Sequence, residues 1–66
     1  MVIDQKKLKL AMMEKGFNVA SLARAAGMSP AAVNLYVNHG VKPRLDSLGK
    51  LVKALGVPVM EIVREA

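Results

Sequence analysis

Residues 18–38, NVASLARAAGMSPAAVNLYVN, contain two short helical patterns that meet at Gly27. Small apolar residues end the first pattern, and Ser29-Pro30 opens the second. Serine is a common N-cap, and proline is tolerated in the first turn of a helix. Glycine at the junction can adopt the left-handed backbone conformation that a tight turn requires. The stretch therefore predicts two short helices joined by a tight turn over about residues 18–38.

The flanking segments predict three further short helices, and thus an all-α domain of five helices. Asp4 can cap the first helix, and the i, i+3, i+4 spacing of Leu8, Ala11 and Met12 marks its buried face. The chain contains no internal repeat or linker, and its 66 residues suffice for a single domain over residues 1–66. The predicted helices span residues 4–15, 19–26, 30–37, 45–55 and 59–65.

The residue types that enzymes and metal sites need are scarce in this chain. It has no cysteine, which excludes disulfides and thiolate metal sites, and it has one histidine, His39. That histidine has no nucleophile arrangement near it in the sequence, and no glycine-rich phosphate loop is present. We therefore expect neither an enzyme nor a bound cofactor or metal.

The charge balance favours a polyanionic partner. Ten Lys and Arg stand against five Asp and Glu, which gives a net charge of +5. Nucleic acid is the commonest partner of such a chain, although a merely solvated basic surface is the alternative. No apolar run approaches the roughly 18 residues of a membrane span, and no signal peptide is visible. These features predict a cytoplasmic protein without a membrane partner.

The order of these residues resembles the phage repressor and Cro type of helix-turn-helix domain, often called the xenobiotic response element (XRE) family. The resemblance extends over nearly the whole chain and implies a lambda-repressor-like fold that binds double-stranded DNA. Two positions depart from the family pattern: Val19 replaces a phosphate-contacting Gln, and His39 replaces a Gly. The resemblance rests on Gly16-Phe17-Asn18, Leu22-Ala23, Gly27-Met28-Ser29, Val33, Asn38, Lys42-Pro43, Leu45, Leu48 and Ala54-Leu55-Gly56-Val57.

In the resembling family the second helix of the motif lies in the major groove. Asn34 is the one outward side chain of that helix able to contact a base edge twice, most naturally adenine; a solvated amide is the alternative. Ser29 at the helix N-terminus can reach a phosphate, and the cations after the helix either neutralise phosphates or form a solvated cluster. The predicted DNA-binding residues are Ser29, Pro30, Ala31, Ala32, Asn34, Leu35, Asn38, His39, Lys42 and Arg44.

The end of the chain is more apolar than a small domain needs. Members of the resembling family often pair through this region, so we expect a homodimer, with packing onto the domain's own core as the alternative. Leu10 and Met13 form a second apolar pair that can serve as a partner surface. The predicted dimer interface consists of Val57, Val59, Met60, Ile62 and Val63.

Two functions fit these features. The leading hypothesis is a sequence-specific transcriptional regulator of phage or prokaryotic type, a repressor that binds a pseudo-palindromic operator as a dimer. The alternative is a protein-interaction module on the same fold, such as an antitoxin or the DNA-targeting domain of a larger phage or transposition protein. The apolar character of the predicted recognition helix, which holds Ala31, Ala32 and Leu35, motivates this alternative.

Overall fold

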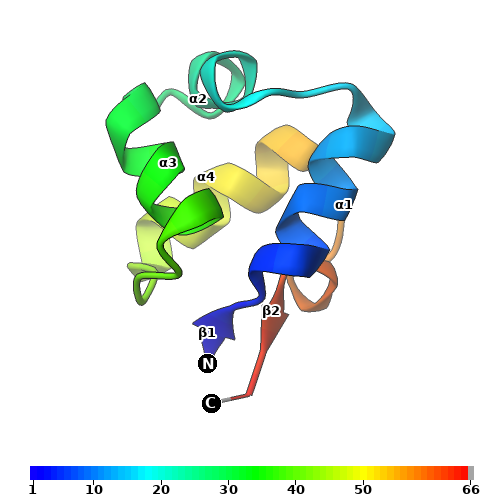
Figure 1. Cartoon of the computed structure of the whole chain (residues 1–66), viewed down its shortest axis with the longest axis vertical. Helices are drawn as coiled ribbons and strands as arrows, with labels where there is room; N and C mark the ends of the chain where they lie inside the picture. Colours follow the sequence, from blue (N-terminus) through cyan, green and yellow to red (C-terminus); the bar gives the residue numbers. More distant parts are fainter. Residues whose placement is uncertain (66) are drawn as a thin grey trace.

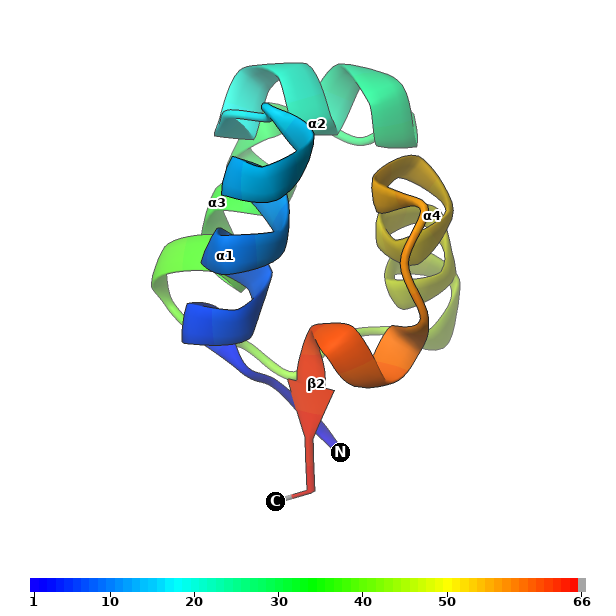
Figure 2. The same cartoon turned by 90° about the vertical axis from the view of Figure 1, so that its right-hand side faces the viewer.

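The computed structural model describes residues 1–65, which form four α-helices, one turn of 3₁₀ helix and a two-stranded sheet (Figure 1). Helix α2 lies across one end of the molecule, with α1 and α3 on one side beneath it and α4 on the other (Figure 2). No helix within residues 1–65 is long and apolar enough to cross a membrane. In chain order the elements are β1 (Val2–Ile3), α1 (Gln5–Lys15), α2 (Val19–Ala26), α3 (Pro30–Asn38), α4 (Leu45–Leu55), η1 (Val59–Glu61) and β2 (Val63–Arg64).

The four long helices begin and end close to the predicted positions. The side chain of Asp4 accepts a hydrogen bond from the Lys7 backbone N–H at 3.0 Å, which confirms it as the N-cap of α1. The bounds of α2 and α4 agree with the prediction, and α3 extends one residue further, to Asn38. Side-chain caps mark the starts of α1, α2 and α3, whereas α4 begins after Arg44 without a side-chain capping bond.

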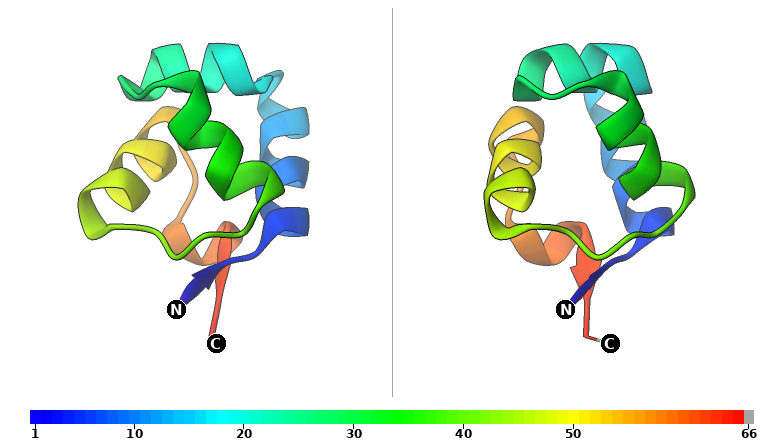
Figure 3. Two further views of the ribbon diagram at one scale, coloured as in Figure 1. Left: turned by 60° about the vertical axis from the view of Figure 1, so that its left-hand side comes forward. Right: turned by 90° about the vertical axis from the view of Figure 1, so that its left-hand side faces the viewer.

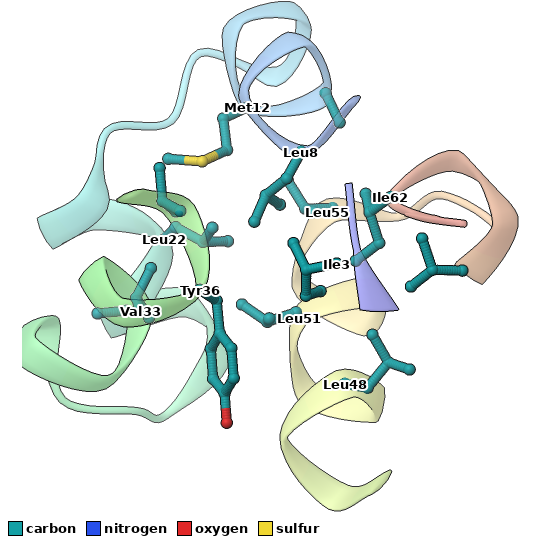
Figure 4. Close-up of a cluster of buried hydrophobic side chains, with 14 residues drawn as sticks. Ile3, Leu8, Met12, Leu22, Val33, Tyr36, Leu48, Leu51, Leu55 and Ile62 are labelled. Atoms are coloured by element: carbon teal, nitrogen blue, oxygen red, sulfur yellow. The ribbon is translucent and has the colours of Figure 1, made fainter. Parts of the chain in front are cut away.

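The core is aliphatic, because the chain has only two aromatic residues, Phe17 and Tyr36. Leu8, Leu22 and Leu51 are fully buried where α1, α2 and α4 meet, and Val33 joins them from α3 (Figure 4). Tyr36 is the one aromatic residue in this cluster of buried side chains, and its hydroxyl points out of the cluster. These contacts hold α2 and α3 at a fixed angle on the platform formed by α1 and α4.

The prediction of a fifth helix over residues 59–65 is wrong. Only Val59–Glu61 forms a helical turn, of the 3₁₀ type, and Val63–Arg64 then pairs antiparallel with Val2–Ile3. The Asp4 N–H also donates to the Ile62 carbonyl at 2.9 Å. Valine and isoleucine favour extended backbone, and the first residues of the chain provide the pairing strand. The fold is therefore mostly helical, with both chain ends side by side (Figure 1).

This pairing also corrects part of the predicted dimer interface. Ile62 and Val63 have no exposed surface, since both side chains enter the core of their own chain. They are therefore unavailable to a second copy. Val57 and Val59 are half-buried, and Met60 keeps 58% of its surface exposed.

Candidate nucleic-acid interface

The first helix of the motif, α2, is fixed at its start by a reciprocal pair of hydrogen bonds. The Asn18 side chain accepts from the Ser21 N–H at 2.8 Å, and Ser21 Oγ accepts from the Asn18 N–H at 2.9 Å. Two backbone donors at the helix end are thereby satisfied. Asn18 is a common N-cap residue type, whereas the role of Ser21 was not predicted. Its spacing, three residues after a capping side chain, was the signal that could have revealed it.

The turn between α2 and α3 depends on Gly27. Its φ of 68° lies in the left-handed region, and its N–H donates to the Arg24 carbonyl at 3.3 Å. The next N–H, of Met28, donates to the Ala23 carbonyl at 2.9 Å, which closes the end of α2. Ala23 is buried and Met28 packs half-buried against the core, so the turn is held from both sides.

The N-terminus of α3 retains few groups for a phosphate. Ser29 Oγ accepts from the Ala32 N–H at 3.1 Å, which confirms Ser29 as the cap. Pro30 has no N–H, and the Val33 N–H donates to the Ser29 carbonyl at 3.1 Å. The Ala31 N–H and the Ser29 hydroxyl proton remain as donors at this helix end. The positive end of the helix dipole lies at the same place.

The outer face of α3 is uncovered by other elements (Figure 3). Pro30 and Ala31 are exposed, and Leu35 keeps 46% of its surface exposed. Ala32 and Asn34 are half-buried, which makes them less accessible than the sequence suggested. This face is therefore largely apolar and built from small side chains, so it can approach a surface closely.

The polar groups of this face occur as a pair. Asn38 Nδ2 donates a hydrogen bond to Asn34 Oδ1, one helical turn away on the same face. The bond occupies one acceptor of Asn34 and one donor of Asn38. The side-chain NH₂ group of Asn34 and the side-chain oxygen of Asn38, Oδ1, then remain for a ligand. Asn34 was predicted as the base-contacting residue and Asn38 as a DNA-binding residue that follows the helix, with the backbone-gripping loop, and the structure joins the two side chains.

The loop after α3 presents cations on an anchored backbone. The His39 N–H donates to the Leu35 carbonyl at 3.1 Å, and Gly40 turns the chain with a φ of 59°. Val41 packs half-buried against the core, whereas Lys42 and Arg44 are exposed. The loop runs from the lower end of α3 to the start of α4 (Figure 3). Its two cations are therefore exposed in the segment that directly follows α3.

Leu45 is an exposed residue that the sequence did not reveal. It is the first residue of α4 and keeps 89% of its surface exposed. It lies three residues before the buried Leu48 and so shares a helix face with it. At the helix start, however, this face extends past the core, and Leu45 remains beside the cation Arg44.

A family model described as helix-turn-helix (HTH_3, the Cro/C1 or XRE type) matches residues 8–62. The match covers 55 of the 66 residues and includes α2, the turn at Gly27, α3 and the cationic loop. No curated protein and no solved structure gives a significant match to the chain.

Proposed function

Because the chain belongs to the Cro/C1-type (XRE) helix-turn-helix family, which consists of DNA-binding domains and not of enzymes, we propose that it is a sequence-specific transcriptional regulator. The observation that carries the proposal is the uncovered outer face of α3 next to the cationic loop. A recognition helix needs such a face to enter the major groove. Its small residues, Pro30 and Ala31, permit close approach to the bases.

Phosphate contacts supply most of the affinity in this proposal. Lys42, Arg44 and His39 lie in the loop that follows α3, and cations there neutralise phosphates without reading sequence. Ser29 and the Ala31 N–H hold a second phosphate at the start of α3. Together these contacts would grip the backbone at both ends of the recognition helix.

Sequence is read by the asparagine pair and by methyl contacts. The Asn34 side-chain NH₂ group offers a donor that adenine N7 accepts, and Asn38 Oδ1 offers an acceptor for the adenine N6 amino group. Leu35 and the half-buried Ala32 fit thymine methyl groups. DNA shape adds specificity at positions that no side chain touches.

We further propose that the protein is a repressor that binds a pseudo-palindromic operator as a dimer in the cytoplasm of a prokaryote. A two-fold dimer presents two α3 helices to two half-sites, which multiplies the contacts of a small domain. Val57, Val59 and Met60 are the members of the predicted interface that retain exposed surface. Occupation of a promoter by this dimer would block transcription.

A salt titration tests the phosphate contacts. Labelled duplex DNA is titrated with wild type, Lys42→Ala and the control Lys9→Ala, which removes the same charge from an exposed position of α1. We expect Lys42→Ala to weaken binding equally for all sequences and to reduce the salt slope by about 1, whereas Lys9→Ala keeps the wild-type slope. Absence of tight duplex binding by wild type at low salt would refute the proposed function.

A selection of bound sequences from random DNA tests base reading. We expect Asn34→Ala and Asn38→Ala to relax preference at the same base position in each half-site, at a cost of about 1–3 kcal/mol. The double variant is expected to cost little more than either single variant, because the two side chains act as one unit. Unchanged base preference in both single variants would remove the pair from the reading face.

The exposed apolar residues of the DNA-facing side favour a second candidate function, a protein-interaction module such as an antitoxin. Leu35 and Leu45 are 46% and 89% exposed, more than a purely phosphate-binding surface needs. A toxin gene next to this gene, whose product co-purifies with this chain and is released by Leu35→Asp, would support it. A chain that purifies without that product counts against it.

A further inference from the structure

A cavity of about 510 Å³ lies where the first turn of α1, the loop after α3 and the paired strands β1 and β2 meet. This is the end of the molecule opposite α2 (Figures 1 and 2). Among the residues that line the cavity, only His39 belongs to the predicted DNA-binding residues. The cavity is therefore a separate feature that shares one residue with the proposed DNA contacts.

Three basic side chains line this cavity, and each comes from a different element. Lys6 belongs to α1, His39 ends α3, and Arg64 belongs to β2. All three residues are exposed, so their polar groups are accessible to a ligand. They are far apart in the sequence, and the fold brings them to the wall of one cavity.

The single acidic residue that lines the cavity is already engaged in capping α1. Asp4 is half-buried, and its Oδ1 accepts a hydrogen bond from the Lys7 N–H at 3.0 Å. Lys6 and Arg64 outweigh its negative charge even when His39 is neutral. The cavity therefore attracts anions.

The wall between α1 and the loop after α3 is closely packed. An added Cβ at Gly40 would lie 2.7 Å from Gln5 Nε2, so the Gln5 amide packs against the Gly40 backbone. This amide is a further hydrogen-bond donor beside the three basic side chains. A ligand in the cavity would thus contact α1 and the loop that carries Lys42 at the same time.

We infer that this cavity binds the phosphate group of a phosphate ester through Lys6, His39 and Arg64. A guanidinium donates two parallel hydrogen bonds to phosphate, and an ammonium acts as a point charge. Donors that come from three elements suit the tetrahedral oxygens of a phosphate better than the two coplanar oxygens of a carboxylate. The volume lies in the range of small-molecule sites, roughly 300–1,000 Å³, so the group that carries the phosphate fits as well.

Two sources can supply this phosphate ester, and the chemistry of recognition is the same for both. The first is the DNA backbone, which rests on the proposed function and extends its phosphate contacts from His39 to Lys6 and Arg64. The second is a free sugar phosphate or similar small molecule. Such a ligand would join the loop after α3 to α1 and β2.

Titration of the isotope-labelled full chain with inorganic phosphate and with ribose 5-phosphate, followed by NMR at constant ionic strength, tests the site. We expect saturable shifts of the Lys6, Gly40 and Arg64 amide signals, and no saturable shifts with acetate as the control anion. Lys6→Ala and Arg64→Ala should each weaken phosphate binding about three- to fivefold, because each removes one exposed charge. Arg64→Lys should fall between wild type and Arg64→Ala, since it keeps the charge and loses the bidentate contact.

Lys53→Ala is the matched control, because it removes the same charge from an exposed position of α4 outside the cavity. It is expected to leave phosphate binding unchanged. Weakening by Lys53→Ala equal to that by Lys6→Ala would overturn the inference, since net charge and not the cavity would then hold the anion.

Duplex titrations of the same variants at several salt concentrations distinguish the two sources. A salt slope reduced by about 1 in both Lys6→Ala and Arg64→Ala identifies a DNA phosphate. An unchanged slope together with weakened ribose 5-phosphate binding identifies a free phosphate ester. Wild-type salt slopes in both variants, without saturable shifts from either phosphate compound, overturn the inference alone. Phosphate binding by a chain that binds no duplex rejects the DNA-binding function alone.

Discussion

Replacement of single glycines by alanine separates two opposite backbone effects in this fold. Gly49 lies inside α4, where an added Cβ meets no atom within 4 Å, so Gly49→Ala should stabilise the helix by about 1 kcal/mol. Gly27 also has free space around a Cβ, but its φ is +68°. There alanine must adopt the left-handed region, at a cost of about 1–2 kcal/mol. The same substitution thus has opposite signs at two equally uncrowded positions.

At Gly40 the backbone is also left-handed, and in addition an added Cβ would contact a side chain. Its φ is +59°, and Gln5 Nε2 lies 2.7 Å from the position of an added Cβ. The amide is the end of a flexible side chain and can rotate away, so Gly40→Ala should cost about as much as Gly27→Ala, roughly 1–2 kcal/mol. Gly40→Ala should therefore destabilise the loop that carries Lys42 no more than Gly27→Ala destabilises the turn between α2 and α3.

Thermal unfolding followed by far-ultraviolet circular dichroism measures all three variants. A chain of this size has an unfolding entropy near 0.14 kcal/mol/K, so each kcal/mol shifts Tm by about 7 °C. Gly49→Ala should raise Tm by about 7 °C, and Gly27→Ala and Gly40→Ala should lower it by about 7–14 °C. An unchanged Tm for Gly27→Ala would refute the reasoning about the turn. A much larger loss for Gly40→Ala, reversed by adding Gln5→Ala, would show that Gln5 is fixed in place.

Two further substitutions test the burial of Ile62 and the capping role of Ser21. Ile62→Ala should destabilise the fold by about 2–5 kcal/mol in urea unfolding, because it empties a fully buried site, whereas the exposed control Met60→Ala should change stability by less than about 0.5 kcal/mol. Equal effects at the two positions would contradict the burial of Ile62. Ser21→Ala should cost about 0.5–2 kcal/mol by removing the acceptor of the Asn18 N–H, and a neutral result would mean that water replaces the hydroxyl without loss.

The helix-turn-helix part of the fold was predictable because its signals are local. Asn18, Gly27 and Ser29 each act on backbone groups within a few residues, so the sequence alone located the ends of α2 and α3. The end of the chain was not predictable in this way. The state of residues 59–65 depends on pairing with Val2–Ile3, some 60 positions away in sequence. Spacing that suits a helix was overridden by a distant strand partner.

In the candidate site too, features with a local sequence signal were predictable and the others were not. Exposure of Lys42 and Arg44 followed from their place in a polar loop after a helix end, and their location beside α3 followed from the motif. The exposure of Leu45 could not be predicted, because helix spacing indicates which face a residue occupies and not whether the core extends as far as the start of the helix. The bond between Asn34 and Asn38 was also missed, although the i, i+4 spacing permits it.

That asparagine bond decides how α3 can read a base. A bidentate contact by Asn34 alone needs both its oxygen and its nitrogen, so it either uses the second lone pair of an oxygen that already accepts from Asn38 or displaces that bond, at about 0.5–1.5 kcal/mol. A bidentate contact yields about 1–3 kcal/mol of discrimination, so breaking the bond would consume much of it. Reading through the free Asn34 NH₂ group and the free Asn38 oxygen keeps the bond and the preorganised geometry. We therefore expect the pair, rather than Asn34 alone, to determine the preferred base, with Asn38→Ala as damaging as Asn34→Ala.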